Sequence, residues 1–236
     1  AWLATSCCVA PAPGTGAGVN FNNFFFDPPV LNNAGQTAFR GTLTGAGVEV
    51  TNNEGIWSEG GGSGLALVAR EGAAAPDTGA GVSLSSFRTP PVLNGAGQTS
   101  FYSFLTGAGV VDTNDEGIWS VGGGSGLALV VREGDAAPGT GAGVNFDGFG
   151  LPMINDAGQI AFWGVLAGAG VNSTNNQGIW LKGGGAGLSL VVRESDAAPG
   201  TAAGVNFSGM GALVLNGAGQ TAFIGSLTGA GVDSTN

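Results

Sequence analysis

The charged residues most able to carry chemistry are three Arg-Glu pairs, which contain three of the six basic residues: Arg70-Glu71, Arg132-Glu133 and Arg193-Glu194. A guanidinium beside a carboxylate could form a ring of acid/base groups or bind carbohydrate. The alternative is a charge network at the end of a strand, repeated because the structural unit repeats. We favour the network, because active sites on repeated scaffolds usually depart from the consensus.

The sequence lacks most catalytic signatures. Without histidine there is no Ser-His-Asp or Cys-His pair and no zinc site of the ordinary type. The Gly-x-Gly strings precede no helix that could bind a phosphate. The 16 acidic residues leave room for a pair of glycosidase carboxylates, but no pair is singled out. We therefore predict a protein that is not an enzyme and has no cofactor.

A turn rich in asparagine and acid offers the best metal candidate. Asp112, Asn114 and Glu116 are spaced somewhat like the oxygen ligands of a calcium loop. The corresponding turns 49–54 and 172–177 lose most of that charge, and none supplies the distant glutamate of an EF-hand. We interpret these side chains as turn caps and predict no metal site.

These residues belong to a larger repeated pattern. The segment Asn-x-x-Gly-x-x-Ala/Ser-Phe occurs four times, at Asn32–Phe39, Asn94–Phe101, Asn155–Phe162 and Asn216–Phe223. Its starts are 62, 61 and 61 residues apart (94 − 32, 155 − 94 and 216 − 155). Such a period predicts a single repeat domain over 1–236. Its repeats are 1–63, 64–125, 126–186 and an incomplete 187–236.

The motif resembles the NxxGxxAF tandem repeats of bacterial surface proteins, with Ser100 in place of alanine as the one departure. The rest of the period also recurs, so the resemblance covers essentially the whole chain. It implies an exported, extracellular or cell-surface location, often with a wall or membrane anchor. It implies no established activity and supplies no catalytic residues.

Each repeat is expected to contain four strands. The first is Gly126–Glu133 and its equivalents, followed by a proline turn. The second follows a Gly-Val-Asn-Phe turn, residues 18–21 in the first repeat, and ends at the motif asparagine, with Pro29–Asn32 as its clearest part. The motif itself forms a hairpin, because Asn and Gly tolerate positive φ. Gln220–Leu227 typifies the third strand, and a second Asn-x-x-Gly hairpin precedes the fourth, Gly55–Trp57.

This pattern predicts an all-β fold, a β-propeller-like array of four repeats of about 61 residues with four strands each. The apolar strands are typical of sheets covered on both faces. A β-solenoid is the alternative, but its coils normally lack two hairpins per repeat. The last repeat ends where its Gly-Ile-Trp strand should begin, so we expect it to lack a strand.

Composition limits the partners. The net charge is −10, which repels nucleic acid and anionic membranes, and no apolar run is long enough to span a bilayer. Only 9% of residues are charged, 43% are hydrophobic and 48 are glycine. The adjacent Cys7 and Cys8 cannot form a conventional disulfide staple, and we interpret them as small buried residues.

Binding candidates lie where the repeats differ, in the connection before the second strand's Pro-Val-Leu segment and directly after the motif phenylalanine. They are Phe24, Phe25, Phe26, Arg40, Phe87, Arg88, Tyr102, Phe149 and Trp163. Variable aromatics on a repeated scaffold are typical of a lectin-like surface for glycans or of a protein interface. They could equally fill gaps between imperfectly identical repeats.

The incomplete repeat suggests self-assembly. Gln220–Leu227 is expected at an open sheet edge, and Gln220–Asn236 contains only Asp233 as a charged residue. Open edges recruit other chains. Further repeats, imperfect closure by the first strand, or an edge donated by a second copy could cover it. We favour donation, which gives a head-to-tail filament or surface layer.

Overall fold

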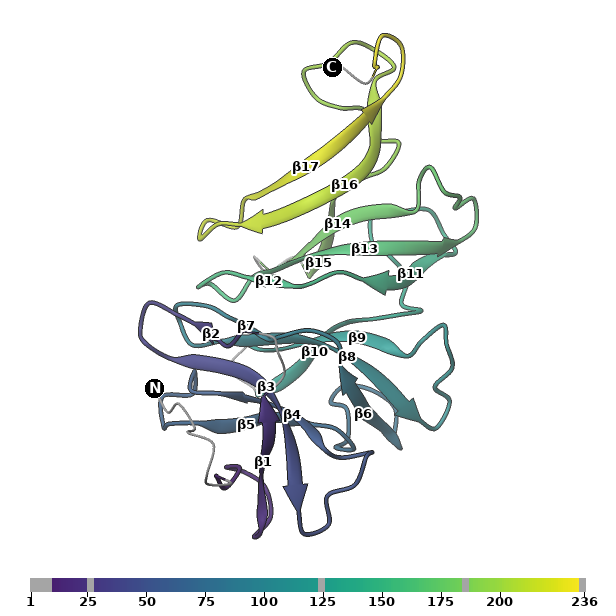
Figure 1. Cartoon of the computed structure of the whole chain (residues 1–236). Helices are drawn as coiled ribbons and strands as arrows, with labels where there is room; N and C mark the ends of the chain where they lie inside the picture. The colour runs from purple at the N-terminus through teal and green to yellow at the C-terminus, as the bar shows by residue number, and fades with distance from the viewer. Residues whose placement is uncertain (1–9, 25–27, 123–125, 184–186, 234–236) are drawn as a thin grey trace.

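The computed structural model describes residues 10–24, 28–122, 126–183 and 187–233, and every regular element in them is a β-strand. These residues contain no helix long and apolar enough to cross a membrane. The strands form four antiparallel sheets, three of five strands and one of two. The expectation of an all-β, propeller-like array is confirmed, although the array is open (Figure 1).

The first three sheets share one topology. Four strands form an antiparallel meander, and a short fifth strand pairs with the second strand of that meander. The first sheet contains β1 (Val19–Phe24), β2 (Val30–Leu31), β3 (Thr37–Gly45), β4 (Glu54–Ser58) and β5 (Ala66–Arg70). The second contains β6 (Val82–Phe87), β7 (Val92–Leu93), β8 (Thr99–Gly107), β9 (Glu116–Val121) and β10 (Leu127–Arg132). The third contains β11 (Val144–Phe149), β12 (Met153–Ile154), β13 (Ile160–Gly168), β14 (Gln177–Lys182) and β15 (Leu188–Arg193).

The fourth sheet consists of β16 (Asn206–Leu215) and β17 (Thr221–Thr228) alone. Strand β17 corresponds to β3, β8 and β13, each of which has a partner on both sides. Within the described residues, β17 pairs only with β16. The last repeat therefore lacks a strand in the described residues, as expected from the sequence. The first sheet does not pair with β17, because the two lie at opposite ends of the molecule (Figure 1).

The sheets are out of phase with the sequence repeats by one strand. β5, at the start of the second repeat, pairs with β4 and so completes the sheet of the first repeat; β10 and β15 behave in the same way. The proline turn after each such strand then begins the next sheet, as the bridge between Ala74 and Ser83 shows. Each sheet therefore combines residues from two consecutive sequence repeats.

Two local expectations were wrong. The single second strand is divided into β1 and β2, and the Val-Asn-Phe segment expected in a turn is the start of β1. A bulge at Phe21–Asn23 shifts the register, and the chain then leaves β3 and returns to pair with its first residues. The fourth strand, expected at Gly55–Trp57, is β4, and the hairpin turn before it is made by residues 46–52.

The core is layered, because each of the first three sheets buries side chains on both faces. Along β4, Ile56 packs with Phe101 and Trp119 of the second sheet, while Trp57 packs with Phe21 on the opposite face. Ile118 and Tyr102 of the second sheet pack in the same way against Phe162 and Trp180 of the third. In the second sheet, Ile118 thus faces the following sheet and Trp119 faces the preceding one.

Candidate functional site

A ladder of asparagine side chains crosses all four sheets. Asn32 Nδ2 donates to the carbonyl oxygen of Asn94 at 2.8 Å, and Asn94 Nδ2 donates to that of Asn155 at 2.6 Å. Asn155 Nδ2 continues the ladder to the carbonyl of Asn216 at 2.9 Å. The first residue of each repeat motif is therefore a joint between sheets.

The same asparagine also shapes its own hairpin. Asn155 Oδ1 accepts the backbone N–H groups of Ala157 and Gln159 at 3.1 and 3.0 Å, and Asn155 Nδ2 donates to Gln159 Oε1 at 2.7 Å. Both amide hydrogens and the side-chain oxygen are used. No other side chain of this length supplies this set of donors and acceptors, which explains why the motif begins with asparagine and continues with glutamine.

The Arg-Glu pairs hold turns within a sheet. Arg70 Nε donates to Asn52 O at 2.9 Å, and the carboxylate of Glu71 accepts the N–H of Asn53 at 3.0 Å. Arg132 and Arg193 make the same contact with Asn114 and Asn175 at 2.8 and 2.7 Å. These contacts join the end of the last strand of the sheet to the turn before the strand beside it. They agree with the structural interpretation of the pairs.

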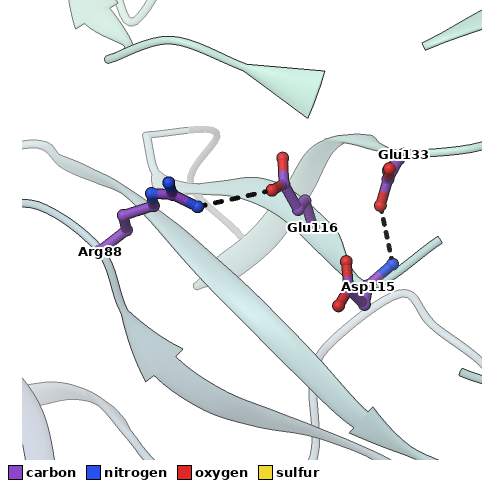
Figure 2. Close-up of polar contacts among 4 residues, drawn as sticks. All are labelled: Arg88, Asp115, Glu116 and Glu133. Carbon is purple, nitrogen blue, oxygen red and sulfur yellow. Dashed lines mark hydrogen bonds and ion pairs between the residues drawn. The ribbon is translucent and has the colours of Figure 1, made fainter. Parts of the chain in front are cut away.

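Glu133 is the most electrostatically unusual of these residues. It is 4% exposed, and its carboxylate accepts the N–H of Asp115 at 2.9 Å (Figure 2). Burial raises its pKa to about 7, and the neighbouring carboxylates of Asp115 and Glu116 act in the same direction. Burial also raises the pKa values of Glu71 and Glu194. The shift therefore recurs with the repeat, as expected of a structural feature.

Glu116 connects this carboxylate cluster to the predicted binding residues. Arg88 Nη1 lies 3.8 Å from Glu116 Oε1 (Figure 2), and its guanidinium sits 5.2 Å from the ring centre of Phe104. Phe104 in turn contacts Tyr102 edge to face, with ring centres 5.7 Å apart. Burial and the adjacent Glu116 raise the pKa of Tyr102. Arg88 itself is exposed, with 59% of its side chain accessible to solvent.

The other predicted binding residues lie on different sheets and form no common surface. Phe87 and Tyr102 are buried, at 1% and 3% exposure, and Arg40 Nη1 donates to the carbonyl of Phe87 between the first and second sheets. Phe149 and Trp163 are half-buried, and Phe24 is 46% exposed. Phe25 and Phe26 lie outside the described residues.

The variable position after the motif phenylalanine belongs to the joints between sheets. Arg40 and Tyr102 both face the following sheet, and by strand alternation Trp163 faces β16. Ile224 occupies this position in the last sheet, where it is 66% exposed. Sequence reasoning had offered gap filling between repeats as the alternative to binding, and Arg40 and Tyr102 do lie between sheets.

The turns offer little that could hold a metal or a substrate. Asn114 Oδ1 accepts the N–H of Val111 at 2.9 Å, so this side chain of the calcium-like segment caps its turn. No group of three acidic or cysteine side chains in the described parts of the chain is placed to hold a metal. An open hollow beside Glu133 is lined by Asn114, Arg132 and Asp135, and Arg132 and Asn114 are the pair that stabilises the turn.

Comparison with known proteins gives one match. A family model described as a family of unknown function (DUF7453) matches residues 9–236. No curated protein and no solved structure matches the chain.

Proposed function

Because the chain belongs to this family of unknown function, DUF7453, we propose its role from the architecture: a non-enzymatic structural repeat protein that assembles with copies of itself. The proposed assembly is a head-to-tail filament or layer outside the cell. The extracellular location is supported by the resemblance of the repeat motif to bacterial surface proteins.

One observation carries the proposal: among the described residues, no sheet covers the face of the last sheet that is covered in the earlier sheets. Ala38, Ser100 and Ala161 occupy equivalent positions in the first three sheets, and each is 0% exposed. Ala222 holds that position in β17 and is exposed. Together with the open edge of β17, this apolar surface favours binding of another β-sheet.

Sedimentation velocity over a range of protein concentrations tests the proposal. We expect the mean mass to rise with concentration well above the 22.9 kDa of one chain, and electron microscopy to show elongated particles. A single species of chain mass up to high micromolar concentration would contradict self-assembly.

The glycan-binding alternative has less support. A stacking surface needs exposed aromatic rings, and Phe87 and Tyr102 are covered by neighbouring sheets while Phe24 is half exposed. A glycan array tests this alternative, with Phe24→Ala and Arg88→Ala as the variants expected to lose any binding found. Turnover on a panel of polysaccharides would contradict the non-enzymatic assignment.

A further inference from the structure

We infer that the outer face of the β16–β17 hairpin docks on the outer face of the first sheet of a second copy, in the register of the internal joints. This inference rests on the proposed self-assembly. It specifies contact between sheet faces, whereas the sequence had suggested donation of a strand to the β17 edge.

The docking surface of the last sheet, here called the tail face, is apolar and exposed. Val214 pairs with Ala222 across the hairpin, so both lie on the same side as Ile224. Val214 is 60% exposed and Ile224 66%. Phe223 lies on the opposite side, where it contacts Phe207. The tail face is therefore the side that would cover a next sheet.

The docking surface of the first sheet, here called the head face, is formed by Leu31, Phe24 and Phe39. Leu31 pairs with Thr37 and Phe24 pairs with Gly41, which places both on the Phe39 side of the sheet. Leu31 is 69% exposed and Phe24 46%. Phe24 and Phe39 are in contact, with ring centres 5.4 Å apart.

The contact between the second and third sheets shows how a tail face and a head face fit together. In the third sheet, Ile154, Phe149 and Phe162 occupy the positions of Leu31, Phe24 and Phe39. They pack in one cluster with Tyr102 of the second sheet. Because Tyr102 corresponds to Ile224, the joint between the second and third sheets combines a tail-type face with a head-type face. In the part of the chain that the structure describes, the first and last sheets carry the same two halves exposed.

A polar contact fixes the register. Asn94 and Asn155 each donate to the next sheet in addition to their own glutamine, whereas among the described residues Asn216 Nδ2 donates only to Gln220 Oε1, at 2.8 Å. At the other end, the carbonyl of Asn32 accepts the N–H of Gly35 at 3.0 Å, and no sheet of the described residues precedes it. Docking in register would bring Asn216 Nδ2 of one copy to Asn32 O of the next.

The two faces differ, so the contact is heterologous and propagates along a line. Two variants test it: Ile224→Asp places a charge on the tail face, and Leu31→Asp places one on the head face. Val50→Asp is the matched control, because Val50 is 82% exposed in a turn and belongs to neither face. Circular dichroism establishes that each variant is folded.

We expect each face variant alone to lose assembly and sediment as a single chain, while Val50→Asp assembles like the parent. Mixing the two variants should give a 1:1 complex of two chains and nothing larger, since each keeps the face that the other lacks.

Assembly of both face variants to the parent's extent would overturn face docking but leave self-assembly intact, and would favour pairing at the β17 edge. A mixture that stays monomeric, although the parent assembles, would also overturn the head-to-tail contact. A parent chain that never assembles would overturn both proposals.

Discussion

At the scale of single residues, the side chain of the motif asparagine makes hydrogen bonds both within its own turn and to the next sheet. Asn155 makes the turn contacts of its own hairpin and also the contact to the next sheet. Asn216 makes the same turn contacts without the contact to a following sheet. Comparing Asn155 with Asn216 therefore separates the contribution of the contact between sheets from that of the turn contacts.

We expect Asn155→Ala to lower the free energy of unfolding by roughly 2–4 kcal/mol, since it removes several partly buried hydrogen bonds and leaves the carbonyl of Asn216 without this donor. Asn216→Ala is the control and should cost about 1 kcal/mol, typical of a lost cap. Urea unfolding, followed by tryptophan fluorescence in dilute protein, measures both. Equal losses would show that the contact between sheets contributes nothing.

The buried carboxyl of Glu133 gives a pH dependence of known sign. Its pKa rises from 4.5 to about 7 on folding, so the folded state holds the proton more tightly than the unfolded chain. This contribution to stability is fully present below pH 4.5 and is lost as the pH rises toward 7. Its size is at most about 3.5 kcal/mol, since one pKa unit corresponds to about 1.4 kcal/mol.

Glu133→Gln removes the titrating group and keeps an oxygen to accept the N–H of Asp115. We expect its free energy of unfolding to fall less steeply between pH 4.5 and 7 than that of the parent. Denaturant unfolding across this range measures the slope. Glu49→Gln, in an exposed turn, is the control and should leave the slope unchanged. A slope in Glu133→Gln equal to the parent's would contradict the assignment.

At the scale of elements, the hairpin turns set how closely the sheets approach. The motif glycines Gly35 and Gly97 have φ values of 78° and 81°, in the region that disfavours other residues. Only Gly97 meets another sheet: a Cβ there would lie 2.4 Å from the carbonyl oxygen of Gly60, whereas one at Gly35 would meet nothing within 4 Å. The same backbone conformation therefore occurs with and without a neighbouring sheet.

We expect Gly35→Ala to lower the free energy of unfolding by about 1–2 kcal/mol through backbone strain alone. Gly97→Ala should cost more, by roughly 1–3 kcal/mol, because the turn must also move away from the first sheet. Thermal or urea unfolding of the two variants gives the difference. Equal losses of unfolding free energy in the two variants would show that the turn at Gly97 can move away from Gly60 at no cost in stability.

At the scale of the whole molecule, net charge opposes an association that the surfaces favour. The chain carries a net charge of −10, while the residues of the proposed head and tail faces are uncharged. Two copies therefore repel each other at a distance, and their contact would be apolar. Salt should weaken the repulsion and leave the contact itself almost unaffected.

We expect self-association to strengthen as NaCl rises from about 0.05 to about 0.5 M, a range over which the Debye length falls several-fold. Sedimentation velocity at fixed protein concentration measures the change in mean mass. The Leu31→Asp variant serves as the control and should stay monomeric throughout. Weakening of the parent's assembly by salt would indicate an interface of charge pairs and would contradict the uncharged contact.

Local signals in the sequence were enough to predict the period, the motif hairpin at Asn32–Gly35, and strands such as β3 and β4. These features depend on turn residues and apolar runs within about ten residues. The division of the expected second strand into β1 and β2 was missed, because it arises from pairing with β3.

Tertiary structure decided what the recurring and variable residues do. The sequence predicted Asn94 as a turn residue, but its contact with Asn155 exists only because two sheets stack. Tyr102 was a candidate binding aromatic, and it is buried because the third sheet covers it. The pKa of Glu133 and the exposure of Ile224 likewise depend on which surfaces lie opposite. Sequence alone determined the repeating unit, whereas the contacts between units, made by residues about 61 apart, required the fold.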